Sequence, residues 1–161
     1  GTIDFQNEGT EFDVFGGEAM TRIYPVSGLD IYANYAIHYT LTTVPQGAIG
    51  LRTSEARTSA HRLNFGIQYR SEFGLDLSAD IHYASEQVWL EQVFDVEQGV
   101  VYQEFPLPQY YMLNARIGYR LFDDALEVGI VGYNITDHRH RQHPFGQLLS
   151  ARFLFTVAFR I

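Results

Sequence analysis

The segment His138–His143 (HRHRQH) is the densest group of ion-binding side chains in this sequence. Its three histidines are two and three residues apart and could coordinate a transition metal. Its two arginines, Arg139 and Arg141, could instead bind phosphate groups, because a guanidinium makes bidentate contacts with phosphate oxygens. Asp137 is the only carboxylate close by. Three interpretations stay open at this point: an ordinary solvated loop, a phosphate contact and a metal site.

Tight metal binding and a bound cofactor are both unexpected. The chain has no cysteine, so no thiolate ligand exists. The histidine segment is followed by Pro144 and Gly146 rather than held between two rigid strands. The sequence also lacks a glycine-rich phosphate loop and a metalloprotease helix. We therefore predict no metal-ligating and no cofactor-binding residue.

Catalysis and nucleic-acid binding are disfavoured on similar grounds. A nucleophilic enzyme needs a nucleophile and a base within reach of each other. The nearest pairs are Ser59 with His61 and His82 with Ser85, and neither has an identifiable third member. The net charge of -8 argues against nucleic acid, which requires a basic face. We predict that the protein is not an enzyme and has no catalytic residue.

Apolar residues recur with a period of two along most of the chain, which is the spacing of a half-buried β-strand. This pattern predicts seven strands: residues 12–24, 29–41, 63–70, 75–83, 111–121, 126–131 and 149–161. Soluble strands average about 5 to 6 residues, whereas a tilted membrane strand needs about 9 to 11. The lengths therefore favour an all-β chain that crosses a membrane with antiparallel strands.

The connections between these strands alternate between short and long. Residues 25–28, 71–74 and 122–125 form the short ones, and residues 42–61, 84–109 and 136–148 form the long ones. Outer-membrane barrels have short periplasmic turns and longer extracellular loops. We therefore expect residues 1–161 to be part of such a barrel, with about seven strands. The last strand would then end in the periplasm.

A barrel wall has one face toward lipid and one toward the interior, and the alternation assigns the side chains to them. Six apolar residues are expected to face lipid: Leu63, Phe65, Ile67, Leu77, Phe153 and Phe155. Eight polar residues are expected to face the interior: Asp30, Asn34, Asn64, Gln68, Asp80, Asn114, Arg116 and Arg152. Further polar residues on that side are His38, Asp76, His82, Arg120 and Glu127. Hydrogen-bonded filling of the interior and a wall along a substrate path both remain open.

Aromatic residues gather toward the two ends of the expected strands. One group lies near the short turns: Tyr24, Tyr69, Tyr119, Phe122 and Phe159. The other lies toward the long connections: Tyr39, Tyr83, Trp89, Tyr110, Tyr111 and Phe145. This arrangement is typical of the two interfacial girdles of a membrane barrel. The alternative is that aromatic residues are simply frequent in strands.

Several stretches of the chain resemble the closing barrel strands of TonB-dependent receptors. These stretches are FDVFGGEAMTRIY (12–24) after Asn7-Glu8-Gly9, GLDIYANYAIHYT (28–40), YNITDHRHRQHPFG (133–146) and RFLFTVAFRI (152–161). The resemblance extends over nearly the whole chain, which corresponds to the last third or so of such a barrel. One departure is the final residue, Ile161, where the family usually has phenylalanine.

The resemblance implies uptake of a scarce ligand, such as an iron-siderophore or cobalamin, across the outer membrane. It implies as partners the remaining barrel strands, a plug domain not seen in this sequence, and TonB acting through that plug. Arg139 and Arg141 would then meet lipopolysaccharide phosphates outside the cell. The opening GTIDFQNEG suggests the tail of an earlier strand, so we expect both outermost strands to pair outside this sequence. A small stand-alone barrel serving as anchor, adhesin or channel is the alternative.

Overall fold

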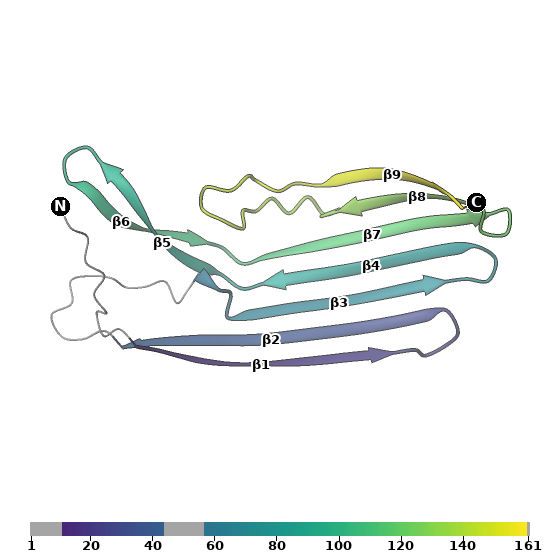
Figure 1. Cartoon of the computed structure of the whole chain (residues 1–161), viewed down its shortest axis with the longest axis horizontal. Coiled ribbons are helices and arrows are strands. Elements are labelled where there is room, and N and C mark those ends of the chain that lie inside the picture. The colour runs from purple at the N-terminus through teal and green to yellow at the C-terminus, as the bar shows by residue number, and fades with distance from the viewer. Residues whose placement is uncertain (1–10, 44–56, 161) are drawn as a thin grey trace.

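The computed structural model describes residues 11–43 and 57–160, which form nine β-strands and no helix. Seven of them make one antiparallel sheet, in the order β1-β2-β3-β4-β7-β8-β9 (Figure 1). Their bounds are β1 (Glu11–Ile23), β2 (Leu29–Thr43), β3 (His61–Arg70), β4 (Leu75–Ala84), β7 (Tyr110–Leu121), β8 (Leu126–Tyr133) and β9 (Arg152–Phe159). The remaining two, β5 (Gln87–Asp95) and β6 (Gly99–Leu107), pair only with each other among the described residues.

All seven predicted strands are present and lie in the main sheet, so the all-β antiparallel prediction is confirmed. The ends differ slightly, since β2 continues to Thr43 and β9 begins only at Arg152. The long connection predicted over 84–109 is present between β4 and β7, but it contains two strands that were not predicted, β5 and β6, which form a hairpin. The expectations for the opening residues and for Ile161 lie outside the described residues.

The short connections are tight turns at one end of the sheet (Figure 1). Gly28 and Gly74 have φ angles of 79° and 100°, which glycine adopts without steric cost. A Cβ atom on Gly28 would lie 2.1 Å from the carbonyl oxygen of Arg70. Such a close approach explains why glycine occupies this turn beside β3.

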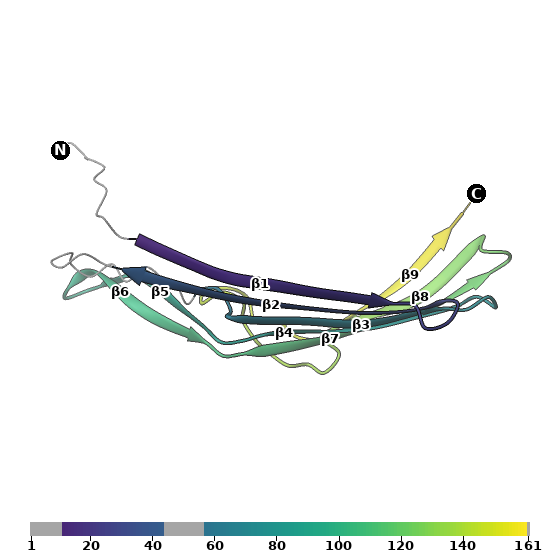
Figure 2. The same ribbon diagram turned by 90° about the horizontal axis from the view of Figure 1, so that it is seen from below.

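The main sheet is a single bowed layer, with β1 and β8–β9 rising on the same side of the central strands (Figure 2). Among the described residues the buried hydrophobic side chains are Ala84, Leu107 and Tyr110. Large apolar side chains are instead exposed along most strands. Soluble monomers rarely expose continuous apolar surfaces this large. No helix of the described residues is long and apolar enough to cross a membrane.

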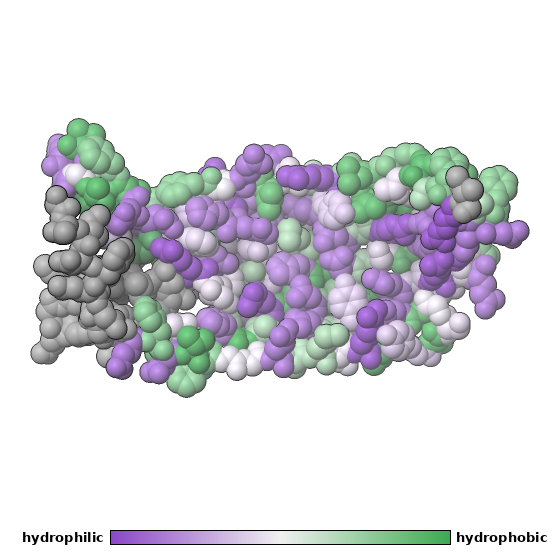
Figure 3. All heavy atoms as spheres, in the orientation of Figure 1, coloured by the Kyte–Doolittle hydropathy of each residue, from purple (hydrophilic) through white to green (hydrophobic). Residues whose placement is uncertain are grey.

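The strand register divides the side chains between two chemically different faces. Directly opposed residues share a face, and successive opposed pairs link Asp30 to Gln68 and Asn34 to Asn64. Continuing across the sheet, all eight residues expected inside the barrel share one face. The six residues expected to face lipid share the other and are exposed. We call the face with the eight polar residues the polar face and the face with the six apolar residues the apolar face. Figure 3 shows the polar face, which is mostly hydrophilic over the central strands.

Candidate functional site

A belt of hydrogen-bonded side chains crosses the polar face from β1 to β4. The amide of Asn34 donates to Glu18 at 2.6 Å, and the amide of Asn64 donates to Asn34 at 3.4 Å. His82 Nδ1 then lies 2.6 Å from Asn64 Oδ1 and donates to it, since that oxygen can only accept. The belt forms because opposed residues of neighbouring strands bring their side chains together on one face.

Polar pairs continue on the same face beyond this belt. Asn114 donates to Asp80 at 2.8 Å, and its own carbonyl oxygen accepts from the backbone N–H of Asn134 at 3.0 Å. Ion pairs join Arg22 to Asp30 and Arg116 to Glu127. Most of the polar residues predicted for the interior are thus held by partners within the sheet.

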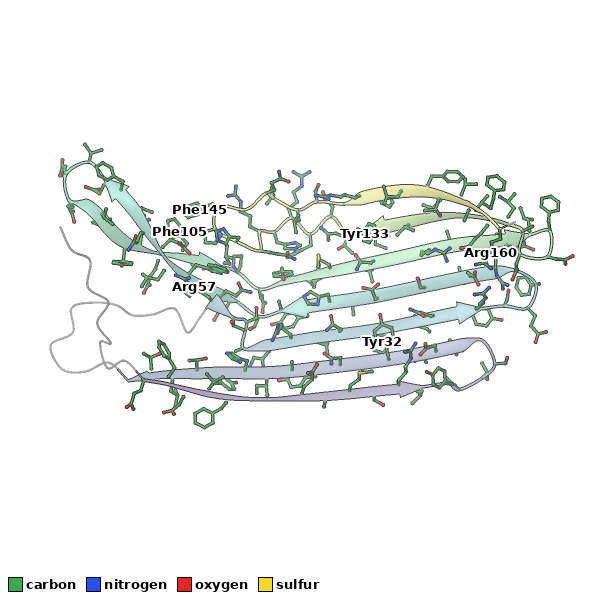
Figure 4. All side chains as sticks on the ribbon, viewed as in Figure 1. Tyr32, Arg57, Phe105, Tyr133, Phe145 and Arg160 are labelled. Atoms are coloured by element: carbon green, nitrogen blue, oxygen red, sulfur yellow. The ribbon has the colours of Figure 1, made fainter. Side chains whose placement is uncertain are left out.

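One glycine of the polar face makes room for an aromatic ring. A Cβ atom on Gly66 would lie 2.3 Å from Cζ of Tyr32, so the ring of Tyr32 lies directly over β3 (Figure 4). A side chain at position 66 would displace this ring. No pattern in the sequence singled out either residue.

An open hollow of about 390 Å³ lies toward the short-turn end of the polar face. Its lining includes Asp30, Gln68, Arg70, Asp76, Ser78 and Arg116. Both charge signs occur around it, so it favours a polar, hydrogen-bonding occupant. Gln68, one of the residues predicted for the interior, lies in this lining.

Arg120 organises a charge cluster at the same end. It contacts Asp76 at 3.1 Å, both oxygens of Asp124 at 2.8 and 3.0 Å, and the carbonyl of Ser71 at 2.6 Å. Arg70 adds longer ion pairs to Asp76 at 3.8 Å and Asp124 at 3.6 Å. The cluster ties the β3–β4 turn to the β7–β8 turn.

The histidine segment lies at the opposite end and packs on aromatic rings. His140 is buried and stacks on Tyr110, with ring centroids 4.2 Å apart and planes inclined by 7°. His138 stacks on Tyr111 at 4.4 Å. Two of the three histidines therefore hold the loop against the start of β7, a packing role that the solvated-loop interpretation did not foresee.

The placement of Tyr110 corrects the predicted outer girdle. Tyr110 is opposed to Ala84 and lies on the polar face, because its register matches that of His82 and Asp80. Trp89 belongs to the β5–β6 hairpin rather than to the main sheet. On the apolar face, opposed pairs do align Tyr35, Tyr83 and Tyr111 at one level through Leu63. Tyr39 lies further along the same face of β2.

The β5–β6 hairpin rests on the loop that carries the histidines. Trp89 meets His143 edge to face at 4.6 Å, and Phe105 meets Phe145 at 5.2 Å (Figure 4). Arg57 lies over the ring of Trp89, with Cζ 5.5 Å from its centroid, and pairs with Glu91 at 3.7 Å. The two long connections thus form one packed unit.

Two other contacts fix the base of the histidine loop. The carboxylate of Asp137 accepts hydrogen bonds from the backbone N–H of Ala151 at 2.9 Å and from Arg139 at 3.2 Å. These donors hold the pKa of Asp137 below its usual value. Arg139 remains largely exposed, and Arg141 donates to the carbonyl of Pro144 at 3.2 Å. Their contact with lipopolysaccharide stays a prediction.

The side chains of both serine–histidine pairs bind other groups. The hydroxyl of Ser85 accepts a hydrogen bond from the backbone N–H of His61 at 3.1 Å, and His82 is hydrogen-bonded to Asn64. The hydroxyl of Ser59 donates to the Ser85 carbonyl at 3.0 Å and accepts from Gln87 at 2.7 Å. Both ring nitrogens of His61 instead lie near tyrosine hydroxyls, those of Tyr35 at 2.7 Å and Tyr39 at 3.2 Å. Within residues 11–43 and 57–160, no three His, Asp or Glu side chains are grouped so as to hold a metal ion.

Comparison with known proteins shows that the fold of this chain also occurs in receptor barrels. No protein-family model matches the chain, and no curated protein matches it in sequence. Its fold is shared with the Pseudomonas aeruginosa receptor FpvA bound to a heterologous pyoverdine, at a TM-score of 0.71 and 14% identity over 91% of this chain. A complex of FpvAI with pyocin S2 matches at 0.70 and 12% identity, also over 91%. The ferripyoverdine receptor of the outer membrane of Pseudomonas aeruginosa, bound to ferripyoverdine, matches at 0.68 and 14% over the same share.

This chain spans only 18–19% of the length of those three receptors. The chain therefore shares the fold of a segment of these receptors, in agreement with the barrel segment that the sequence resemblance implied. These structural neighbours are receptors rather than enzymes.

Proposed function

We propose that this chain is part of the barrel wall of an outer-membrane TonB-dependent receptor that takes up a scarce ligand, such as an iron-siderophore or cobalamin. The observation that carries the proposal is the single-layer sheet with one polar and one apolar face. In water the apolar face would be exposed without a partner layer, whereas in an outer membrane lipid covers it. The fold shared with the ferripyoverdine receptor supports the same conclusion.

The spacing of aromatic side chains on the apolar face fits this membrane. Tyr111 and Tyr119 are eight residues apart on β7, or about 27 Å along a strand that rises about 3.4 Å per residue. A tilt of about 40° reduces this to roughly 20 Å across the membrane, close to the apolar band of about 25 Å in such barrels. Tyr111 would then lie at the outer interface and Tyr119 at the inner one.

The polar face would line the interior of the barrel. Its hydrogen-bonded belt and charge cluster are mostly satisfied within the sheet, so they suit a wall against which a plug domain rests. The hollow near Gln68 and Arg116 leaves polar groups for such a partner. In this proposal TonB acts through the plug, the remaining strands complete the barrel, and Arg139 and Arg141 meet lipopolysaccharide.

The stand-alone barrel has less support. Closure of a small barrel would pair β1 with β9, but among the described residues these two edge strands are not hydrogen-bonded to each other. An unpaired edge in hydrocarbon leaves backbone groups without hydrogen bonds, at several kcal/mol each. Pairing of these edges with further strands of a larger barrel removes that cost.

Ligand uptake by Gram-negative cells tests the proposal. The gene for the intact protein is deleted, and uptake of a panel of radiolabelled ferric siderophores and cobalamin is compared with that of the parent and of a TonB-deficient strain. We expect uptake of one ligand to fall in both mutants, with the protein found in the outer-membrane fraction. Unchanged uptake of every ligand, or recovery of the protein in the soluble fraction, contradicts the proposal.

A further inference from the structure

The β5–β6 hairpin concentrates negative charge at the end of the sheet with the long connections. From Ser85 to Tyr110 the sequence has five carboxylates and neither arginine nor lysine, while the whole chain has a net charge of -8. The five are Glu86, Glu91, Asp95, Glu97 and Glu104. Of these, Glu91 has an arginine partner, Arg57, at 3.7 Å. The proposed role of the main sheet as a barrel wall does not explain these carboxylates.

The same hairpin exposes a set of large apolar side chains. The opposed pairs Phe94–Val100 and Gln92–Tyr102 put these residues on one face of the hairpin. Phe94 is 78% exposed and Val100 is 65% exposed, while Val96 in the turn is 92% exposed. We call Phe94, Val96, Val100 and Tyr102 the hairpin patch. A cluster of apolar groups this open to water is typical of a surface that binds a partner.

The hairpin packs on the histidine loop with the face opposite to the patch, so the patch itself is not covered by that loop. Trp89 and Phe105 are opposed to each other on that other face, and they contact His143 and Phe145. Figure 1 shows the hairpin projecting past the end of the main sheet. The patch is therefore presented away from the loop that anchors the hairpin.

The turn between β5 and β6, which carries Val96, is held by hydrogen bonds. The carboxylate of Asp95 accepts hydrogen bonds from the backbone N–H groups of Glu97 and Gln98, both at 2.8 Å, and Gly99 has a φ of 79°. These two donors hold the pKa of Asp95 below its usual value, so it stays charged at neutral pH. A preformed apolar surface loses less conformational entropy on binding than a flexible one.

We propose that the hairpin patch docks a polypeptide whose contact surface is basic and partly apolar. Charge complementarity with the five carboxylates selects this occupant. A second copy of the hairpin would place carboxylates against carboxylates, and lipopolysaccharide phosphates are repelled in the same way. Small molecules bind in concave sites, which a projecting hairpin face does not provide. The proposal rests on the orientation proposed above, which places the hairpin outside the cell.

Selection from a library of random 12-residue peptides displayed on phage tests this docking surface. The target is the intact protein in detergent, and selected peptides are then synthesised and their affinity is measured at low and high salt. We expect enrichment of peptides that combine arginine or lysine with aromatic or aliphatic residues, and weaker binding at high salt. Enrichment of neutral or acidic peptides, or no enrichment, overturns the proposal.

Two variants locate the binding on the hairpin. The double variant Phe94→Ser/Val100→Ser should weaken binding of the selected peptides by about tenfold or more, because it removes two large apolar side chains from the contact surface. The double variant Glu97→Gln/Glu104→Gln should weaken them and reduce the salt dependence. Matched controls at the opposite end of the sheet, Phe122→Ser and Glu72→Gln, should leave affinity unchanged. Equal affinity for all four proteins places the binding elsewhere and refutes the proposal.

The same variants separate this proposal from the proposed uptake function. Outer-membrane fractionation and ligand uptake are measured for each of them. If the protein supports normal uptake but its hairpin patch binds no basic peptide, the docking proposal is refuted and the uptake proposal stands. A protein that binds the peptides but is absent from the outer membrane refutes the receptor proposal.

Discussion

Arg120 contributes to stability through contacts with groups from two different turns. Its side chain is only 9% exposed and contacts Asp76, Asp124 and the Ser71 carbonyl. Removing one member of such a cluster leaves the remaining charges without a counter-ion and the remaining acceptors without a hydrogen-bond donor. We expect Arg120→Gln to lower the free energy of unfolding by about 2 to 3 kcal/mol, measured by guanidinium denaturation of the intact protein in lipid vesicles.

An arginine at the other end of the sheet provides the control. Arg139 is 65% exposed and pairs with Asp137 alone among the described side chains. An exposed ion pair of this kind contributes about 0 to 1 kcal/mol, so Arg139→Gln should barely change unfolding. Similar losses for the two variants would show that the cluster around Arg120 is not a stabilising unit.

Asp137 should make the histidine loop sensitive to acid. Its folded-state pKa is depressed by the N–H of Ala151 and by Arg139, so its stabilising effect is present above the ordinary aspartate pKa of 3.8. That effect is lost as the pH falls through the lower, folded-state pKa. We expect acid-stable protease to cleave the loop faster as the pH drops below about 4, whereas Asp137→Asn should show a weaker dependence on pH. Identical pH profiles for the two proteins would contradict this role.

At the level of the strands, the sequence predicted the main sheet but not the hairpin. The seven predicted strands have one apolar and one polar side, which produces a clear period of two. In β5, Trp89 and Val93 face one way and Leu90 and Phe94 the other, so both sides are apolar and no alternation appears. The Gln98-Gly99 turn between two runs of valine and aromatic residues was the signal that could have revealed it.

The end of the sheet with the long connections was predicted less well for a related reason. Periodicity assigns a residue to a face of a strand, but it does not say which loop folds back onto that strand. Tyr110 was assigned to the girdle because the predicted strand began at Tyr111. In the structure β7 begins at Tyr110, so this side chain falls on the polar face and stacks on His140. The histidines likewise suggested ions or solvent, since their ring partners lie far away in sequence.

The assignment of the apolar face to lipid can be tested within one strand. We expect Ile67→Arg to cost roughly 2 to 4 kcal/mol of unfolding free energy, because the register aligns Ile67 with Ala115, midway between Tyr111 and Tyr119, and so near the middle of the bilayer. Gln68→Arg, on the opposite face of β3 and next to Asp30 and Asp76, should cost much less. Guanidinium unfolding from vesicles measures both. Equal costs would mean that the polar face does not line an aqueous or plugged interior.

For the whole molecule, the central expectation is that β1 and β9 do not pair with each other. The chain contains no cysteine, so pairs can be introduced into a clean background. Cysteines at the opposed positions Val128 and Val157 should oxidise to a disulfide between β8 and β9. Cysteines at Ala19 and Phe155, on β1 and β9, should stay reduced in the membrane-inserted protein. An intramolecular β1–β9 disulfide would favour the stand-alone barrel.

The hairpin between β4 and β7 also affects how the sheet forms. In the main sheet, every other pair of neighbouring strands is also consecutive in the chain, but β4 and β7 must meet across the 25 residues between Ala84 and Tyr110. Closing a longer loop costs more chain entropy and slows folding. Because β5 and β6 pair locally, within about 1 to 10 μs for an isolated hairpin, they draw Gln87 and Leu107 together and leave only short flanking segments to order. We therefore expect the hairpin to speed the pairing of β4 with β7. A substitution at Gly99 that destabilises the hairpin turn should slow the association of β1–β4 with β7–β9.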